Sequence, residues 1–274
     1  MKETKDLKWT FSTLGCPEMS LPEVVALAKR FDLQYLDLRT LEGRVDLPGL
    51  FQEQYGSPDN LARFLEGEGV SLTALNASLK LVGNKPEDRE AFLEFVEWAE
   101  GTKVPLIRVF DGGSVGEELP AEAHEAALDT ISWWRDQKRT YGWATDIGIE
   151  THDCLVSRVA MQQLQDSLEE PVPIIWDTHH TWKKAGDAVP VTWEVVKPYT
   201  RHIHIKDSIS EPSARHPFTY VQLGEGEFDL PGTLQLLCAE DFAGMVSLEW
   251  ERQWHPYLAP LEEALKRARE LGWW

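Results

Sequence analysis

Cysteine and long apolar runs are scarce in this sequence. The three cysteines, Cys16, Cys154 and Cys238, are odd in number and far apart, so they form neither a zinc-binding CxxC pair nor an even disulfide framework. No window approaches the roughly 18 uninterrupted apolar residues of a membrane span, and the N-terminal MKETKDLKWTF has no apolar signal segment. We therefore expect a cytoplasmic protein with no membrane partner.

Basic residues are also in short supply. The 27 Lys and Arg are outnumbered by 46 Asp and Glu, which gives a net charge of −19. Such a surface repels phosphate backbones, because non-specific nucleic-acid binding depends on basic side chains that displace counterions. Nucleic acid is therefore not expected as a partner, and a small-molecule substrate is.

The chain has no obvious linker. No stretch rich in Pro, Gly or Ser divides it, so we expect one domain over residues 1–274. Short β-rich runs alternate with segments of helical period. The predicted strands are residues 8–14, 33–39, 70–77, 104–110, 145–151, 172–177, 201–206 and 244–250, and the predicted helices lie near 21–31, 58–67, 86–101, 120–141, 155–168, 190–198, 229–240 and 259–271.

This alternation indicates the fold class. Eight parallel strands that close into a ring leave no edge strand. The pattern therefore predicts an α/β protein with a single (β/α)8 TIM barrel, and a doubly wound open sheet is the alternative. The longest predicted connections, 40–57 and 207–228, follow the second and seventh strands, where loops at the C-terminal face of a barrel commonly build the active site.

Four polar side chains lie at the ends of consecutive predicted strands. Glu150, Asp177 and Glu249 each close a strand, and His204 lies within HIHIK. Neighbouring strands are about 4.7–4.9 Å apart, so in a barrel these side chains converge on one point. Each has a simpler explanation when taken alone, such as a helix cap or a hydrogen-bonded histidine. Together, carboxylates at one mouth repel each other, and a cation removes that repulsion.

The donor types indicate which cation fits. Three carboxylates and one imidazole are mostly hard ligands, which favour Mn²⁺ or Mg²⁺ and also accept Co²⁺ or Zn²⁺. The sequence therefore predicts one divalent metal held by Glu150, Asp177, His204 and Glu249.

The ordered set of strand-end motifs resembles the xylose isomerase-like barrel superfamily, the type grouped with AP endonuclease family 2, and in particular its sugar phosphate isomerases and epimerases. The motifs are FSTLGCPE, LDLR, IRVFDGG, IETHD, WDTHH, HIHIKD, LGEGEFD and SLEWE, and they cover essentially the whole chain. The resemblance implies the same four metal ligands, with Glu150 and Glu249 also moving the proton. It implies a substrate contact for His180, whereas His179 and His202 have no match and are predicted to be structural.

The expected chemistry is proton transfer beside a carbonyl. A cation chelated by the carbonyl and neighbouring hydroxyl of a ketose makes the α-proton more acidic and stabilises the enediolate. One glutamate then removes the proton and the other returns it. Return to the same carbon gives an epimerase, and return to the adjacent carbon gives an isomerase. We expect one of these two activities on a sugar or sugar-like ketose.

Two further residues suggest a rival enzyme class. His152 and Lys206 lie two residues beyond Glu150 and His204, so strand alternation points them to the same side. Similar His and Lys positions occur in the superfamily's 3-dehydroshikimate dehydratases. A dehydratase-like lyase is therefore the alternative function, and structural roles for both residues are the simpler interpretation.

Other candidates for substrate contacts are Arg39 and Asn76 at the second and third strands and Arg215 in the loop after the seventh. Arg108, in the middle of a strand, is predicted to form a structural salt bridge. The glycines of LGEGEFDLPG offer backbone N–H groups to a phosphate, but the acidic side chains in that loop favour a neutral sugar or polyol-like substrate.

Two alternative functions and one expected contact surface complete the expectations. A non-catalytic sugar-binding barrel keeps the fold without turnover. The endonuclease IV branch needs additional metal-binding histidines on early strands, where this chain has Arg39 and Asn76, and the net charge opposes DNA. The C-terminal Gly272-Trp273-Trp274 suggests an apolar contact in a homodimer.

Overall fold

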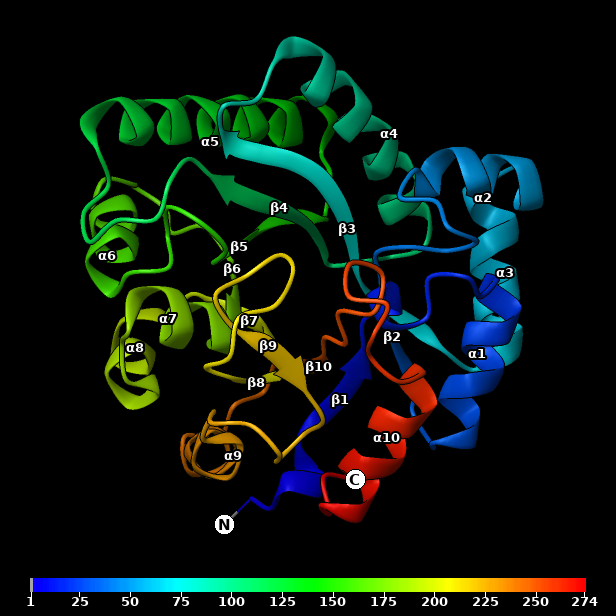
Figure 1. Cartoon of the computed structure of the whole chain (residues 1–274). Coiled ribbons are helices and arrows are strands. Elements are labelled where there is room, and N and C mark those ends of the chain that lie inside the picture. The colour runs from blue at the N-terminus through cyan, green and yellow to red at the C-terminus, as the bar shows by residue number, and fades with distance from the viewer. Residues whose placement is uncertain (1) are drawn as a thin grey trace.

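The barrel in the computed structural model, which describes residues 2–274, has eight parallel strands (Figure 1). They are β1 (Lys8–Phe11), β2 (Tyr35–Leu38), β3 (Ser71–Val82), β4 (Leu106–Gly112), β5 (Asp146–Glu150), β6 (Ile174–Asp177), β7 (Thr200–Ile205) and β10 (Met245–Leu248). Hydrogen bonds join them in the order β1-β10-β7-β6-β5-β4-β3-β2. A parallel bridge between Ser12 and Asp37 then links the β1 side to the β2 side. The predicted (β/α)8 TIM barrel is confirmed.

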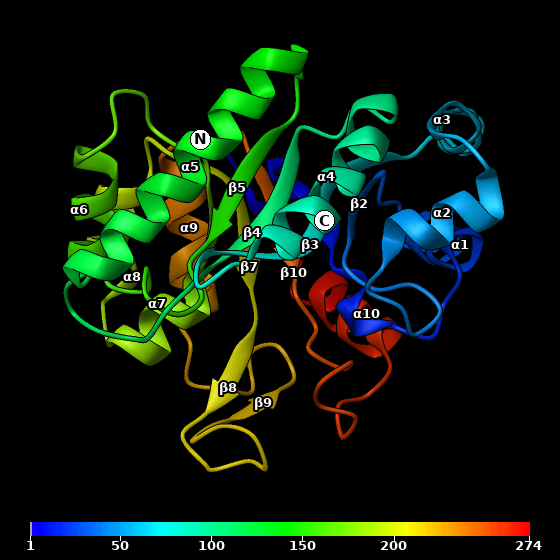
Figure 2. The same cartoon turned by 90° about the horizontal axis from the view of Figure 1, so that it is seen from above.

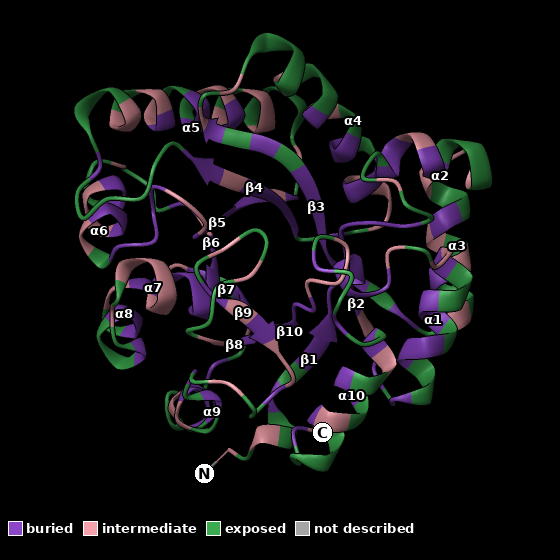
Figure 3. Ribbon diagram, in the orientation of Figure 1, coloured by how far each residue is buried: buried purple, intermediate pink, exposed green. Residues whose placement is uncertain are grey.

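Helices surround this ring, and Figure 3 shows the strands largely buried while exposed residues collect on the outward faces of the helices. The α-helices are α1 (Leu21–Arg30), α2 (Leu47–Tyr55), α3 (Pro58–Glu68), α4 (Pro86–Gly101), α5 (Ala121–Tyr141), α6 (Arg158–Asp166), α7 (Thr178–Ala185), α8 (Val189–Val196), α9 (Leu230–Ala239) and α10 (Leu261–Glu270). In α4, Phe92, Phe95, Val96 and Ala99 form the buried stripe, as expected for a helix with one apolar face against a sheet.

Local chemistry explains how the elements begin and pack. At the start of α1, Glu23 Oε2 accepts a hydrogen bond from the Ser20 backbone N–H at 2.8 Å, and Pro22 occupies the first turn, where it has no helical hydrogen bond to lose. In β5, a Cβ atom on Gly148 would lie 2.9 Å from Ile175 Cγ1 of β6. Glycine is therefore required where these two strands pack.

All eight predicted strands and all eight predicted helices are present, with ends shifted by a few residues. The predicted connection over residues 40–57 contains a helix that was not predicted, α2. Asp46 caps this helix by accepting from the Gly49 N–H at 3.0 Å. The sequence analysis also missed α7, which starts immediately after β6.

The predicted loop over residues 207–228 contains an antiparallel hairpin, β8 (Asp207–Ile209) and β9 (Thr219–Val221). Figure 2 shows this hairpin projecting from one end of the barrel, on the same side as the loop that leads into α10. The two segments flank the mouth formed by the C-terminal ends of the strands.

The C-terminal tryptophans pack within the chain. Trp273 is buried and stacks on Trp9, with ring centroids 4.9 Å apart, and Trp274 lies 5.5 Å from the same ring. Much of this apolar segment is thus occupied intramolecularly, and a homodimer stays a prediction. Within residues 2–274, no helix has both the length and the apolar character to cross a bilayer.

Candidate metal centre

The four predicted ligands meet inside the mouth of the barrel. Glu150 and Asp177 are the last residues of β5 and β6, His204 lies next to the end of β7, and Glu249 follows β10. One potential ligand atom from each lies within 4.8 Å of those from the other three. All four residues are buried. The strand ends therefore bring these donors to one point, as expected.

His204 is at the centre of the cluster. Its Nδ1 lies 3.0 Å from Glu150 Oε1 and 3.3 Å from Glu249 Oε1. Burial alone lowers the pKa of this imidazole, but the negative charge of Glu249 and the hydrogen bonds to Asp37 and Glu150 outweigh it and raise the pKa well above its usual range. Without a metal, the ring is therefore protonated at neutral pH.

Lys206 supplies a second positive charge beside the same carboxylates. Its Nζ lies 2.7 Å from Asp177 Oδ2 and 2.7 Å from Glu251 Oε1, and it also contacts Glu249. Burial opposes the charged form, but the three acids outweigh it and hold the pKa of Lys206 well above its usual range. The sequence analysis did not identify Glu251, whose spacing of two residues from Glu249 in SLEWE is the signal that was available.

Asp177 makes contacts that fit both interpretations of its place at the strand end, a helix cap and a member of the cluster. Its Oδ1 caps α7 by accepting from the His180 N–H at 2.8 Å, and its Oδ2 faces the cluster, 3.0 Å from His180 Nδ1. Burial and repulsion by Glu249 and Glu150 outweigh the attraction of Lys206 and raise the pKa of Asp177 to about 6. A helix cap and a metal ligand are therefore compatible in one carboxylate.

The donor set fits a divalent cation. Asp177 Oδ2 and Glu150 Oε2 are buried atoms that accept no hydrogen bond from residues 2–274, and each instead faces cationic groups. Carboxylate oxygens without hydrogen bonds, together with an imidazole nitrogen, are the ligands that Mn²⁺, Mg²⁺ and Zn²⁺ use. Glu150, Asp177, His204 and Glu249 would hold the ion.

His152 and His180 lie next to each other at the edge of this cluster, with ring centroids 4.7 Å apart and nearly perpendicular planes. His180 is buried, and desolvation followed by the charges of Lys206 and Lys184 holds its pKa well below the usual range, so it is neutral. His152 is one-third exposed at its side chain. It is the member of the pair that solvent reaches.

Asn76 and Arg108 lie behind the cluster. Arg108 Nε lies 3.3 Å from Glu150 Oε2, so the predicted salt bridge is confirmed. The same Nε donates to Asn76 Oδ1 at 3.2 Å, and Asn76 Nδ2 donates to Asp37 and to the Leu38 carbonyl. Both polar groups of the Asn76 side chain are therefore engaged by the protein.

Arg39 lies above Asn76 and donates to the Asn76 carbonyl at 2.9 Å and to Ser78 Oγ at 3.1 Å. Burial and the neighbouring charge of Arg108 lower its pKa to about 9. Arg215 is farther out, on the hairpin loop, with its guanidinium 5.6 Å from the ring of Trp254. These two arginines therefore lie at different depths of the mouth.

Asp37 and Asp111 are buried acids that the sequence analysis did not select. Asp37 Oδ2 lies 3.2 Å from His204 Nε2, on the side of the ring away from Glu150. Asp111 accepts backbone hydrogen bonds from His152, Asp153 and Leu155, and thereby fixes the loop that carries His152. An acid within an otherwise apolar strand, as in YLDL and RVFD, was the available signal.

The histidines predicted to be structural are both buried. His179 Nε2 is 2.7 Å from Ser208 Oγ. His202 Nε2 lies 3.3 Å from Asp37 Oδ2. Both rings adjoin the four-residue cluster without being part of it: the His202 ring centroid lies 5.2 Å from that of His204, and a His179 nitrogen lies within 4.8 Å of an Asp177 carboxylate oxygen.

The backbone N–H groups of the glycine loop after β9 bind the carboxylate of Asp207. Asp207 accepts from the N–H groups of Gly224 at 2.9 Å, Gly226 at 3.0 Å and Phe228 at 3.2 Å. A Cβ atom on Gly226 would come within 2.0 Å of Asp207 Oδ1. These N–H groups are therefore occupied, which agrees with the expectation that the loop does not bind a phosphate.

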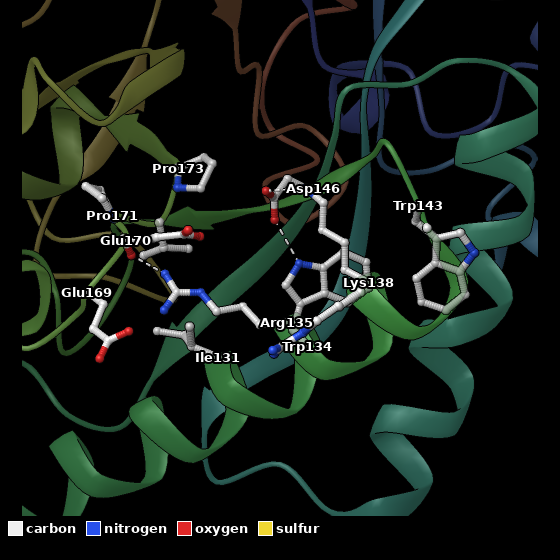
Figure 4. A pocket seen from close by; sticks show the side chains of 13 residues that line it. Ile131, Trp134, Arg135, Lys138, Trp143, Asp146, Glu169, Glu170, Pro171 and Pro173 are labelled. Atoms are coloured by element: carbon white, nitrogen blue, oxygen red, sulfur yellow. Dashed lines mark hydrogen bonds and ion pairs between the residues drawn. The ribbon is translucent and has the colours of Figure 1, made fainter.

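A cavity of about 610 Å³ lies at the opposite end of the barrel, where β5 and β6 begin (Figure 4). Several of its polar side chains are paired within the protein: Asp146 accepts from Trp134 Nε1 at 2.8 Å and from Lys138 at 2.6 Å, and Arg135 donates to the Glu170 backbone carbonyl. In TIM barrels this face serves stability, whereas the C-terminal face carries the chemistry. The cavity is distinct from the metal-type cluster.

A model of the xylose isomerase-like TIM barrel family matches residues 25–272. The chain belongs to this family. Among curated protein sequences, none matches it.

Solved structures of xylose isomerase-like barrels share the fold at low identity. The probable 3-DHS dehydratase AsbF of Bacillus anthracis is 18% identical, with 95% of this chain and 98% of that chain covered and a TM-score of 0.77. The IOLI protein with a zinc atom is 19% identical, with 97% of this chain and 96% of that chain covered and a TM-score of 0.74. A D-tagatose 3-epimerase-like protein is 17% identical, with 97% of this chain and 100% of that chain covered and a TM-score of 0.65. Solved structures with different names thus share this barrel fold with the chain.

Proposed function

We propose that this protein is a divalent-metal-dependent isomerase or epimerase that transfers a proton beside the carbonyl of a neutral sugar or sugar-like ketose. The observation that carries the proposal is the convergence of Glu150, Asp177, His204 and Glu249 within 4.8 Å inside a barrel mouth. Mn²⁺ or Mg²⁺ suits the three carboxylates, and Co²⁺ or Zn²⁺ is the alternative. The zinc in the related IOLI structure supports a metal at this kind of barrel.

The balance of buried charge supports both the cation and a neutral substrate. The carboxylates in and around the cluster are Asp37, Glu150, Asp177, Glu249 and Glu251, and the cationic side chains are Arg39, Arg108 and Lys206. With His204 neutral, as a metal-binding histidine must be, five negative and three positive charges leave two negative charges. One divalent cation neutralises this excess, whereas a phosphorylated substrate would add roughly −1.5 to −2 again. The occupied glycine loop supports the same conclusion.

Glu150 and Glu249 are proposed as the proton-transfer pair. The bound cation would supply positive charge at the substrate carbonyl, which makes the neighbouring C–H more acidic. Burial raises the pKa of both carboxylates, but Arg108 and His204 at Glu150, and His204 and Lys206 at Glu249, outweigh it and lower both values. Both groups are therefore ionised at neutral pH, as a base must be. Neutral His180 and partly exposed His152 are proposed to hydrogen-bond the substrate hydroxyls.

Arg39, Asn76, Lys206 and Arg215 are proposed to contribute to substrate binding, to different extents. Lys206 directly contacts Asp177 and Glu249, so it is adjacent to any group bound there. Asn76 acts on the substrate through the residues it positions, because its side chain is already hydrogen-bonded. Arg215, at the rim, is proposed to contact the distal end of a substrate.

Solvent deuterium exchange tests this function. The Mn²⁺-loaded protein is incubated in D₂O with a panel of ketopentoses, ketohexoses and cyclic polyol ketones, and NMR follows loss of the α-proton signal. We expect exchange for at least one ketose, and no exchange with Glu150→Gln or Glu249→Gln. Glu225→Gln, in an exposed loop position, is the control. Metal binding without exchange on any ketose would contradict the proposal.

A dehydratase-like lyase is the second candidate, favoured by the burial of Lys206 against Asp177 and Glu249 and by the likeness to the probable 3-DHS dehydratase. Incubation with 3-dehydroshikimate distinguishes the two, because loss of water gives an aromatic product with strong ultraviolet absorbance. Appearance of that product, with no exchange on ketoses, would replace the isomerase proposal. A chain that binds sugars without either reaction would be the non-catalytic barrel.

We also propose a cytoplasmic location, because all three cysteines are free and buried, as suits a reducing compartment.

A further inference from the structure

Asp37 is a fully buried carboxylate on β2 that faces the barrel interior. Its Oδ2 accepts a hydrogen bond from Ser247 Oγ at 2.8 Å and lies 3.2 Å from His204 Nε2. Its Oδ1 accepts from Asn76 Nδ2. It therefore meets groups that donate hydrogen bonds on both oxygens.

The orientation of Asn76 is fixed by its other neighbours. Asn76 Nδ2 also donates to the Leu38 carbonyl at 2.9 Å, and Asn76 Oδ1 accepts from Arg108 Nε, which has no lone pair to offer. Turning the amide over would place two donors together at Arg108 and two acceptors together at Leu38. Asn76 thus presents an N–H to Asp37 and cannot present an oxygen.

This environment determines which nitrogen of His204 carries its proton. A neutral imidazole has one N–H and one lone pair, and the partner of one nitrogen sets the state of the other. Asp37 can only accept, so it retains the proton on Nε2. The lone pair is then on Nδ1, the nitrogen that lies 3.0 Å from Glu150 Oε1 and faces the cluster.

We infer that Asp37 is a positioning residue that fixes the Nε2–H tautomer of His204 and so presents Nδ1 to the metal. This assignment rests on the proposed metal centre, and it adds a residue from the opposite side of the barrel. A carboxylate that receives the second N–H of a metal-binding histidine orients the ring and raises its basicity.

The contacts also form a closed ring of hydrogen bonds and ion pairs that includes two of the proposed ligands, Glu150 and His204. Glu150 contacts Arg108, Arg108 donates to Asn76, Asn76 donates to Asp37, and Asp37 pairs with His204, whose Nδ1 returns to Glu150. Asp37 therefore couples the direction of the His204 ring to the position of Glu150. Loss of Asp37 is expected to affect both ligands.

Two substitutions at this position separate tautomer control from simple packing. Asp37→Asn keeps the shape of the side chain but introduces an N–H₂ group. In one orientation this group donates to His204 Nε2 and moves the ring proton to Nδ1. In the other orientation it faces Asn76 Nδ2, which is also a donor. Asp37→Ala removes the acceptor without imposing the wrong tautomer. We expect zinc affinity to fall roughly 10- to 100-fold for Asp37→Ala and further for Asp37→Asn.

A purely structural role predicts the opposite order, because alanine leaves a cavity and asparagine does not. The measurement is Zn²⁺ affinity by competition with a chromophoric chelator, with circular dichroism to verify folding. Ser247→Ala is the matched control, since it removes a donor to the same Asp37 oxygen and leaves His204 paired. We expect it to bind zinc nearly as well as wild type.

The outcomes distinguish this inference from the proposed function. If wild type binds no divalent metal, both fail. If wild type binds zinc and Asp37→Asn binds as tightly as wild type, or more tightly than Asp37→Ala, only the positioning role fails. Should the variants not fold, ¹⁵N NMR of zinc-loaded, histidine-labelled wild type gives the same decision: a protonated Nε2 on His204 supports the inference, and zinc on Nε2 overturns it.

Discussion

Metal binding at this centre should release a defined number of protons. His204 Nδ1 lies 3.0 Å from Glu150 and 3.3 Å from Glu249, and Nε2 lies 3.2 Å from Asp37, so the metal-free ring is held as the imidazolium at pH 7. A metal takes the place of the Nδ1 proton, and the Nε2 proton stays on the Asp37 side. Binding therefore releases about one proton from His204.

Asp177 adds a fraction that depends on pH. With a pKa of about 6, this carboxyl is roughly one-tenth protonated at pH 7 and about half protonated at pH 6, and the metal displaces that proton as well. The expected release is about 1.1 protons at pH 7 and about 1.5 at pH 6. Affinity then weakens by roughly 20-fold as pH falls from 7 to 6, and more steeply below 6.

Calorimetric titration of the metal-free protein with Mn²⁺ or Zn²⁺ measures this release. The binding enthalpy is determined at one pH in several buffers of different ionisation enthalpy, and its slope gives the protons released. His204→Gln is the control, and we expect its slope at pH 7 to fall well below that of wild type, because only carboxyl protons remain to be displaced. A release near zero in wild type, or one that increases as pH rises from 6 to 7, would refute this reasoning.

Three other outcomes are expected. Glu150→Gln and Glu249→Gln should each abolish turnover while circular dichroism stays that of wild type, and near-normal activity of either variant would exclude the two-carboxylate mechanism. Lys206→Met leaves the acids that it pairs uncompensated, so it should lower the free energy of unfolding of the metal-free protein by about 3–5 kcal/mol and increase the rise in Tm on adding Mn²⁺. Equal Tm values for the metal-free variant and metal-free wild type would contradict this. Asp207 holds the glycine loop through backbone N–H groups, so Asp207→Asn should lower the free energy of urea unfolding by about 1.5–3 kcal/mol. The control, Glu225→Gln at an exposed position, should change it by less than about 0.5 kcal/mol, and equal effects of the two substitutions would contradict this role of Asp207.

The sequence predicted the barrel and the four converging donors for a common reason. Parallel strands have their C-terminal ends at one face, so residues that close successive strands meet without any knowledge of loops. Glu150, Asp177 and Glu249 were identified in this way. The alternation of β-rich and helical segments was equally local information.

Elements that the sequence analysis missed carried weaker local signals. Residues 46–49, Asp-Leu-Pro-Gly, open α2 and repeat the four residues that open α9 at 229–232, and in each case the aspartate accepts from the glycine N–H. The helix at the second copy was predicted, over 229–240, whereas the first copy lies in a segment predicted as a connection. A second helix before β3 departs from the simple β/α alternation.

The positions behind the metal-type cluster depend on contacts across the ring. Asp37 lies 167 residues from His204 in the chain, and only closure of the barrel between β1 and β2 brings β2 close to β7 and β10. No periodic pattern within either strand contains that pairing. A charged residue in a strand that is otherwise apolar indicates burial with a partner, but it does not identify which partner.

Crystals grown with Zn²⁺ and measured at the zinc absorption edge test the central claim most directly. The account predicts a single strong anomalous peak in the mouth of the barrel, at about 2.0–2.2 Å from oxygens of Glu150, Asp177 and Glu249 and from Nδ1 of His204. Absence of a peak there, or a peak only at the nearby group of Asp111, His152 and Asp153, would contradict it.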